Sequence, residues 1–376
     1  MREVKMVVLF ILLVICATGI AQTPAGLEDF QECILLGGGF KPANIAIVRL
    51  GKNVVVQPIS VSISANQADC KSRFGRFYIL YDNGELVVVN GKSGEMESKV
   101  QTKIASPFGM EILSETEVIV SSGKDTVLRR IDSQTGEILG LAKIVIPMKE
   151  LACRHMLKIE NRLYVAISCG KINSKPEGTI FAVVDLNSNQ LIQHQLLFWQ
   201  NEKTGEKLPA INPLLPLVFD REQNRILIGA KGVRPRNTGM TLKVDLGTFS
   251  VKSDSYDLSA TFNGHRAISF SQKKVLVLEH TSTPVSSTHV MQKAINDHGD
   301  LEAIDGPAIL DLFEETDDLS INGDGTLAMI ANSCPTGFAI SGKGLNLIDV
   351  RTGKKLPKIM SDTIGFAPEF SVFLQP

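Results

Sequence analysis

Short apolar runs separated by turn residues recur along the chain from about Cys33 onward. The runs are rich in Val, Ile, Leu and Tyr and are bounded by Gly, Asn, Asp or Pro, which is the pattern of β-strands joined by tight turns. Long stretches with helical periodicity are absent from this part of the sequence. The pattern therefore predicts an all-β chain.

One hairpin pattern returns along the chain: an apolar run that ends in Asp or Asn, a turn with Gly or Asn, and a second run. Copies are GELVVVNGKSGEMESKV at 84–100, LRRIDSQTGEILGLAKI at 128–144, FAVVDLNSNQLIQHQLL at 181–197, LKVDLGTFSVKSDSYDL at 242–258 and LNLIDVRTGKKLPKIM at 345–360. Gly94, Gly136 and Gly353 stand where such a hairpin needs a positive φ. Repetition with a period of about 40 to 60 residues predicts the four-stranded blades of a β-propeller.

The turn positions predict the number of blades, whose strands we name A to D from the axis outward. The C–D turns are expected at 51–53, 91–94, 132–136, 186–189, 246–248, 296–299 and 350–353, and the A–B turns at 74–75, 114–116, 159–161, 221–224, 271–273 and 322–325. The first set has one more member than the second. One blade therefore lacks an A–B turn.

The two ends of the chain account for the missing turn. The C-terminal GFAPEFSVFLQP, at 365–376, has the pattern of a strand A with no strand B after it, and the runs that start at Cys33 have the pattern of strands B, C and D with no strand A before them. We therefore predict a seven-bladed β-propeller of four-stranded antiparallel blades. Its ring is closed by the C-terminal strand, which completes the first blade and covers its open edge.

The repeats resemble those of a known family. INGDGTLAMIANS at 321–333 with GLNLIDVRTGKKL at 344–356, NRLYVAIS at 161–168 and RRIDSQTGE at 129–137 resemble the YVTN family of propeller repeats, which is related to surface-layer and quinoprotein amine dehydrogenase-like propellers. The chain departs from WD40 repeats, since it has one tryptophan and no Trp-Asp dipeptide. The resemblance implies the propeller architecture, and its motifs are turn and strand chemistry that carries little information about activity.

The first residues have the pattern of a secretory signal. Arg2 and Lys5 precede the apolar run 6–15, and Gly19 and Ala21 are small residues at the −3 and −1 positions of a cleavage site. We therefore predict a signal peptide at 1–21, an N-terminal segment at 22–32 and one propeller domain at 33–376. This predicts a secreted or periplasmic protein, and no later stretch is apolar and long enough to be a transmembrane helix.

Loop length and charge indicate one end of the propeller as a binding face. The predicted B–C loops of blades 4 to 7, at 168–179, 230–240, 279–288 and 332–344, are long and rich in basic residues, with Arg234 and Arg236 on either side of a proline. The net charge of the whole chain is −1, so nothing indicates a nucleic-acid partner. The loops predict a protein, a peptide or an anionic small molecule as the partner.

Five further residues are candidates for ligand binding near the channel. Arg154 and His155 are expected near strand A of blade 4, His265 and Arg266 on strand A of blade 6, and His280 at the end of strand B of blade 6. Neighbours in a strand point to opposite faces, so one of each His/Arg pair can face the channel. Such a group could bind an anion or supply a general base.

Metal and disulfide chemistry gives weaker signals. No Cys or His spacing typical of zinc is present. We therefore predict no metal site and no cofactor. Bound calcium is an alternative, and its candidate ligands are Glu150, Asn212, Asn263 and Asp318. A bulge in the strands that turn near Glu160 would bring Cys153 and Cys169 within disulfide reach. Cys33 and Cys334, in neighbouring blades, are a second candidate pair.

Two functions stay open on this evidence. The first is a secreted or periplasmic interaction module that binds its partner through the long loops of blades 4 to 7. The second is a propeller enzyme, either a cation-dependent lactonase or hydrolase, or a protein like a dehydrogenase subunit. No catalytic sequence motif is present, and this favours the interaction module over the enzyme.

Overall fold

The computed structural model confirms that the chain is all-β. It describes residues 21–22, 31–37, 44–51, 53–60, 65–145, 151–169, 178–200, 205, 207–209, 217–231, 239–253, 262–271, 274–281, 287–295, 301–303, 310–312, 319–332 and 343–376. Within these ranges the elements are strands, apart from the four-residue helix α1 (Ser361–Ile364). None of the described helical residues forms a helix long and apolar enough to cross a membrane.

The described strands form seven antiparallel sheets of four or five strands, numbered here 1 to 7 in chain order. Sheet 1 contains β1 (Ala21–Gln22), β4 (Asn53–Ile59), β3 (Asn44–Leu50), β2 (Gln31–Gly37) and β31 (Pro368–Phe373). Sheet 2 contains β5 (Gln67–Arg73), β6 (Arg76–Tyr81), β7 (Glu85–Asn90) and β8 (Met96–Gln101). Sheet 3 contains β9 (Pro107–Ile112), β10 (Glu117–Ser122), β11 (Val127–Asp132) and β12 (Ile138–Lys143).

The second half of the chain continues the same order. Sheet 4 contains β13 (Leu151–Ile159), β14 (Arg162–Cys169), β15 (Gly178–Asp185), β16 (Gln190–Gln200) and β17 (Lys207–Pro209). Sheet 5 contains β18 (Val218–Asp220), β19 (Arg225–Lys231), β20 (Gly239–Asp245) and β21 (Val251–Ser253). Sheet 6 contains β22 (Phe262–Ser271), β23 (Lys274–Thr281), β24 (Ser287–Ile295), β25 (Leu301–Ala303) and β26 (Leu310–Leu312). Sheet 7 contains β27 (Ser320–Ile321), β28 (Leu327–Asn332), β29 (Gly344–Asp349) and β30 (Lys354–Met360).

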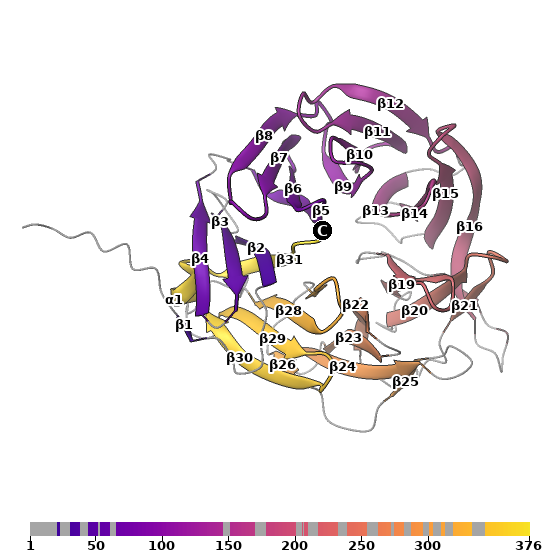
Figure 1. Ribbon diagram of the computed structural model, residues 1–376. Coiled ribbons are helices and arrows are strands. Elements are labelled where there is room, and N and C mark those ends of the chain that lie inside the picture. Colours follow the sequence, from indigo (N-terminus) through magenta and orange to yellow (C-terminus); the bar gives the residue numbers. More distant parts are fainter. Residues whose placement is uncertain are drawn as a thin grey trace, which may run out of the picture.

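The sheets are arranged around a common centre (Figure 1). The strands β5, β9, β13 and β31 lie near the centre, and β4, β8, β12, β16 and β30 lie on the outside. In a β-propeller each sheet is formed by the next segment of the chain, and the sheets surround one axis. The structure therefore confirms the propeller class that the repeated hairpins predict.

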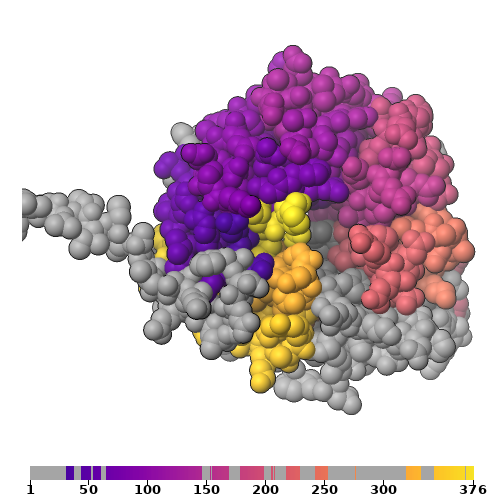
Figure 2. All heavy atoms as spheres, viewed as in Figure 1, coloured from indigo at the N-terminus to yellow at the C-terminus, as the bar shows by residue number. Residues whose placement is uncertain are grey.

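The C-terminal strand joins sheet 1. β31 pairs with β2, with Cys33 opposite Phe373 and Leu35 opposite Ser371. Beyond β31, the backbone N–H groups of Phe74 and Gly75 donate to the carbonyls of Pro376 and Gln375 at 3.1 and 3.0 Å. The last residues thus connect sheets 1 and 2 in the middle of the ring, where Figure 2 shows yellow atoms of this segment. This is the strand pairing that the two ends of the sequence predict.

The turns carry the chemistry expected from the repeats. Asp185 Oδ1 accepts hydrogen bonds from the backbone N–H groups of Asn187 at 3.0 Å and Ser188 at 2.7 Å. Turn-backbone bonds of the same kind are accepted by the side chains of Asn90, Asp132, Asp245 and Asp349. The turn glycines have positive φ, as predicted, at Gly94 (76°), Gly136 (75°) and Gly353 (65°).

Apolar side chains fill the spaces between neighbouring sheets. Between sheets 4 and 5, Tyr164 and Phe181 pack with Ile226 and Leu242, and the rings of Tyr164 and Phe181 stack with centroids 5.9 Å apart. Equivalent clusters lie between sheets 1 and 2, 2 and 3, 3 and 4, and 7 and 1. Since sheets 1 to 4 each bury both faces against their neighbours, this part of the fold depends on side-by-side packing of successive sheets.

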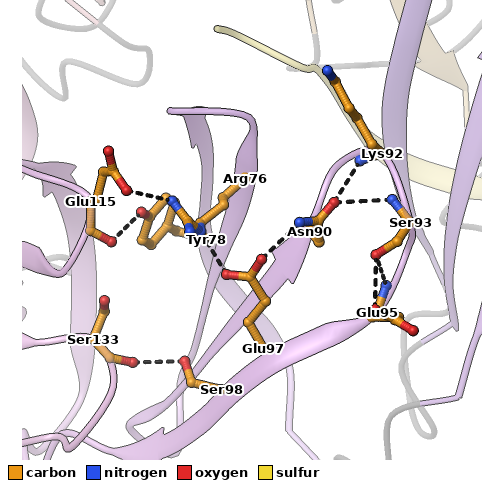
Figure 3. A network of polar contacts seen from close by, with 10 residues as sticks. All are labelled: Arg76, Tyr78, Asn90, Lys92, Ser93, Glu95, Glu97, Ser98, Glu115 and Ser133. Carbon is orange, nitrogen blue, oxygen red and sulfur yellow. Dashed lines mark hydrogen bonds and ion pairs between the residues drawn. The ribbon is translucent and has the colours of Figure 1, made fainter.

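An arginine connects sheet 2 to sheet 3 at the end where the A–B turns lie (Figure 3). Arg76 contacts Glu97 of its own sheet, Nε to Oε2 at 2.6 Å, and Glu115 of the next sheet, Nη1 to Oε2 at 3.0 Å. The hydroxyl of Tyr78 donates to the Glu115 carbonyl at 2.8 Å. The guanidinium group of Arg76 and the hydroxyl of Tyr78, the two polar groups of this Arg-x-Tyr sequence, therefore both have partners within the protein.

Acid is expected to destabilise the fold through its turn carboxylates. Turn N–H groups lower the pKa values of Asp132, Asp185 and Asp245 below the ordinary value of 3.8. A depressed folded-state pKa gives stability that is present above the unfolded value and is lost as the pH falls through the folded value. We expect the free energy of unfolding to decline below about pH 4.

Urea unfolding at several pH values measures this decline. Replacing the three residues, D132N, D185N and D245N, should make the decline shallower, because Asn accepts the same turn bonds without titrating, as Asn90 does in sheet 2. An equally steep decline in the triple variant would show that other groups control the acid sensitivity.

Candidate functional site

A hollow of about 800 Å³ lies between sheets 4 and 5. It is lined by the β13–β14 and β15–β16 turns of sheet 4, by the β18–β19 turn and Leu246 of sheet 5, and by Arg73 at the end of β5. We call it the turn-side hollow. In a four-stranded meander the first and third turns lie at the same end, so the hollow lies at the end opposite the long B–C loops.

Basic side chains outnumber acidic ones in the turn-side hollow. Arg73, Lys158, Arg162 and Arg221 line it, and the acids among its described lining residues are Glu160 and Asp185. Four cations against two carboxylates leave an excess of two positive charges. Such a surface attracts an anion.

Two of these cations have no hydrogen-bond or ion-pair partner in the described structure. Arg162 and Arg221 are exposed, and Asp185 is an electrostatic neighbour of Arg162 that forms no ion pair with it. An arginine carries five donors in a planar fork and suits carboxylate, sulfate or phosphate. The guanidinium groups of both residues are therefore available to a ligand.

Arg162 stands where sheet 2 has an intersheet ion pair. Arg162 and Tyr164 begin β14 as Arg76 and Tyr78 begin β6. In sheet 2 the partner on the next A–B turn is Glu115, which binds both residues. The corresponding turn of sheet 5, at 221–224, also contains an acid, Glu222, but the residues of this turn that line the hollow are Arg221 and Asn224. Among the described contacts, no intersheet ion pair joins Arg162 to this turn.

Arg73 and Lys158 extend the positive charge toward the ring centre. Arg73 Nη1 donates to the carbonyl of Ile112 at 3.2 Å, and Lys158 Nζ donates to that of Leu113 at 2.8 Å. Burial and the neighbouring Arg73 lower the pKa of Lys158. An anion placed beside the two side chains would favour the charged form of Lys158.

A second charged group lies deeper, between the inner strands. Lys71 of β5 contacts Glu111 of β9, Nζ to Oε2 at 2.5 Å, and donates to the Met156 carbonyl of β13 at 3.0 Å. Asp69 Oδ2 accepts from the Met110 N–H at 2.8 Å. This network ties three sheets together at the axis.

The ionisation of the axial network follows from its surroundings. Burial raises the pKa of Asp69, and Lys71 opposes the shift. Burial alone would lower the pKa of Lys71, but the Glu111 and Asp69 carboxylates outweigh it and the pKa is raised. Because the charges of Lys71 and Glu111 are matched within the protein, we assign this network a structural role.

The predicted channel residues of sheet 4 lie on its innermost strand. Arg154 and His155 belong to β13, which has a bulge between Cys153 and His155. His155 is half-buried and pairs in register with Ala166. His155 is not among the described residues that line the turn-side hollow, and the side chain of Arg154 lies outside the described part of the structure. Their role in binding stays a prediction.

The other predicted ligand-binding residues lie in sheet 6 or outside the described ranges. His265 and Arg266 lie on β22 and His280 on β23, with His265 opposite Glu279 and His280 opposite Thr288. The side chains of these three residues lie outside the described part of the structure, as do Arg234 and Arg236 entirely. The long loops of blades 4 to 7 are likewise largely outside it.

The predicted disulfide between Cys153 and Cys169 is not formed in this structure. The Cys153 thiol is free and buried, and burial raises its pKa to about 12. Cys153 lies opposite Ile167, and Cys169 lies opposite Leu151. The bulge follows Cys153 and does not bring the two cysteines opposite each other, and a diagonal pair is farther apart than a disulfide spans. Cys334, the partner proposed for Cys33, lies outside the described residues.

Most of the candidate calcium ligands lie outside the described structure. Glu150, Asn212 and Asp318 lie outside it, and Asn263 is placed on β22 by its backbone alone. In the ranges that are described, no three His, Cys, Asp or Glu side chains are gathered as a metal site would require.

Comparisons with known proteins bear on the architecture. No protein-family model matches the chain, and no curated protein matches its sequence. Hydrazine synthase from Kuenenia stuttgartiensis matches in structure with a TM-score of 0.54 and 9% identity over 77% of this chain and 78% of that one. The β-propeller domain of Cps50 (Swd1) from Myceliophteria thermophila has a TM-score of 0.48 and 10% identity over 79% and 89%. At 9% identity the first likeness shows the fold alone, and the resemblance to YVTN repeats stays an expectation.

The turn-side hollow was not predicted from the sequence, although one signal for it is present. The Arg-x-Tyr sequence occurs at the start of both β6 and β14. Comparing the turns of the next sheets, SETE at 114–117 and REQN at 221–224, shows two acids and no cation in the first, and one acid and one arginine in the second. The added arginine is the sequence signal of extra positive charge beside the second copy.

Proposed function

We propose that the chain is a secreted or periplasmic seven-bladed β-propeller that binds an anionic partner or ligand in the turn-side hollow. The seven sheets would be the blades, and the pairing of β31 with β2 would close the ring. The predicted signal peptide at 1–21 supports export. This retains the interaction module expected from the sequence and adds a contact surface at the other end.

The observation that carries the proposal is the pair of unpartnered arginines. Arg162 and Arg221 come from neighbouring sheets and line the same hollow. Two cations that line one hollow repel each other, and neither has a partner in the described structure to offset this. A bound anion would neutralise both and could be held by each through charge-assisted hydrogen bonds.

Binding of a small polyanion tests the proposal. The probe is tricarballylate, a tricarboxylate without hydroxyl groups, titrated calorimetrically into the mature protein at low salt. The double variant R162Q/R221Q should bind at least about tenfold more weakly, since a hydrogen bond to a charged group contributes about 1.5–3 kcal/mol. The control is R351Q, which removes an exposed arginine of a sheet 7 turn that is paired with Asp349.

Two results would contradict the proposal. One is equal affinity in the wild type and in R162Q/R221Q. The other is no detectable binding of tricarballylate by the wild type at about 10 mM, a concentration that reveals even millimolar affinities.

A further inference from the structure

The turn-side hollow contains neutral hydrogen-bonding groups in addition to its cations. The side-chain amides of Asn161, Asn187 and Asn224 and the hydroxyl of Tyr164 line it. None of these four groups has a hydrogen-bond partner in the described protein, although the backbones of the asparagines do. Each amide offers both a donor and an acceptor. The hollow therefore suits a ligand with several groups that both donate and accept.

The turn-side hollow also has an apolar floor. Tyr164 is buried at 4% exposure, and Ile159, Phe219 and Leu246 are partly buried against the same cluster. All four residues line the hollow. Aromatic and aliphatic side chains of this kind pack against the C–H groups of a ligand and leave its polar groups to the rim.

The cations, the neutral hydrogen-bonding groups and the apolar floor together argue against simpler ligands. A single phosphate or sulfate ion would use the arginines and leave the amides, the aromatic floor and most of about 800 Å³ unused. A fatty acid would use the floor and one cation and would leave the amides without partners. A neutral sugar would leave Arg162 and Arg221 unpaired.

We propose that the ligand is an acidic sugar, a pyranose with a carboxylate, presented as a short oligosaccharide. This rests on the proposed anion-binding function of the same hollow. The carboxylate binds the Arg162 and Arg221 guanidinium groups, the hydroxyls bind the asparagine amides, and ring C–H groups pack on the floor formed with Tyr164. Each group of the hollow then has a chemical partner.

Titration calorimetry with three matched probes tests the inference on the whole mature chain. The probes are trigalacturonate, maltotriose, which has comparable hydroxyls and no charge, and tricarballylate, which has three carboxylates and no hydroxyls. We expect trigalacturonate to bind at least about tenfold more tightly than either of the others, since it forms both kinds of contact.

Variants separate the sugar contacts from the charge contacts. N161A/N187A should weaken trigalacturonate binding and leave tricarballylate binding unchanged, while R162Q/R221Q should weaken both. N66A is the control, because Asn66 immediately precedes β5 and its side-chain amide donates to Asp82, which does not line the hollow. Unchanged melting temperatures would show that each variant is folded.

The outcomes distinguish the two proposals. If tricarballylate binds as tightly as trigalacturonate and N161A/N187A affects neither, the acidic-sugar inference is wrong and the anion-binding function stands. Equal binding of maltotriose and trigalacturonate would also overturn the inference, because charge would then play no part. If neither acidic probe binds, or if R162Q/R221Q binds them unchanged, both proposals fail.

Discussion

Replacement of Phe373 by alanine is expected to lower the free energy of unfolding by about 3–5 kcal/mol, the usual cost of removing a buried phenylalanine. Phe373 is 1% exposed and lies in the apolar cluster between sheets 7 and 1. It is also the residue of β31 opposite Cys33. The substitution therefore leaves a cavity where the last strand of the chain meets the first sheet.

Phe370 supplies the matched control. It lies on the same strand opposite Leu36 and is 39% exposed. F370A removes the same atoms from β31 but opens little internal space, so its effect should be below about 1 kcal/mol. Urea unfolding followed by tryptophan fluorescence and by circular dichroism gives both values. Equal effects of F373A and F370A would mean that β31 does not contribute a buried side chain to the ring.

Replacement of Lys71 by methionine is expected to lower the free energy of unfolding by about 1.5–3 kcal/mol, the range for losing hydrogen bonds to a charged group. The side chains of Lys71 and Glu111 are 24% and 10% exposed. Methionine nearly matches the lysine in size, but it leaves Glu111 charged with no cation and the Met156 carbonyl without its donor. The same unfolding measurement applies.

The surface pair Lys99 and Glu85 controls for the loss of a lysine. Their atoms Nζ and Oε1 are 3.1 Å apart, and the side chains are 31% and 22% exposed. K99M should cost no more than about 1 kcal/mol. In the double variant K71M/E111Q part of the stability should return, because no unpaired carboxylate remains. A K71M effect equal to that of K99M would show that the axial network contributes little to folding.

The hairpins could be predicted from the sequence because their chemistry is local. A turn such as 74–75 or 186–189 is specified by a few adjacent residues, and an Asp or Asn at the strand end accepts the bonds that hold it. The pairing of β31 with β2 joins residues more than three hundred positions apart, yet it was predictable. A strand A with no strand B after it at one end of the repeats, and strands B, C and D with no strand A before them at the other, leave a single way to complete a blade.

The turn-side hollow depends on relations that no local pattern records. Arg73 belongs to sheet 2 and Lys158 to sheet 4, and the field of one acts on the pKa of the other. Arg162 lines the hollow together with Arg221 and Asn224 of the next sheet. Loop length and basic residues instead drew attention to the opposite end of the sheets. The candidates predicted from the sequence were arginines and histidines, while the described lining of the hollow adds asparagine and tyrosine to its arginines.

The most direct test of the central claim is the position of a bound anion. Crystals of the mature protein soaked in selenate, and measured at the selenium absorption edge, would locate the anion by anomalous scattering. We expect a selenium peak within hydrogen-bonding range of both Arg162 and Arg221 in the wild type, and its loss in R162Q/R221Q. Ordered selenate at other basic sites with none in the turn-side hollow would contradict it.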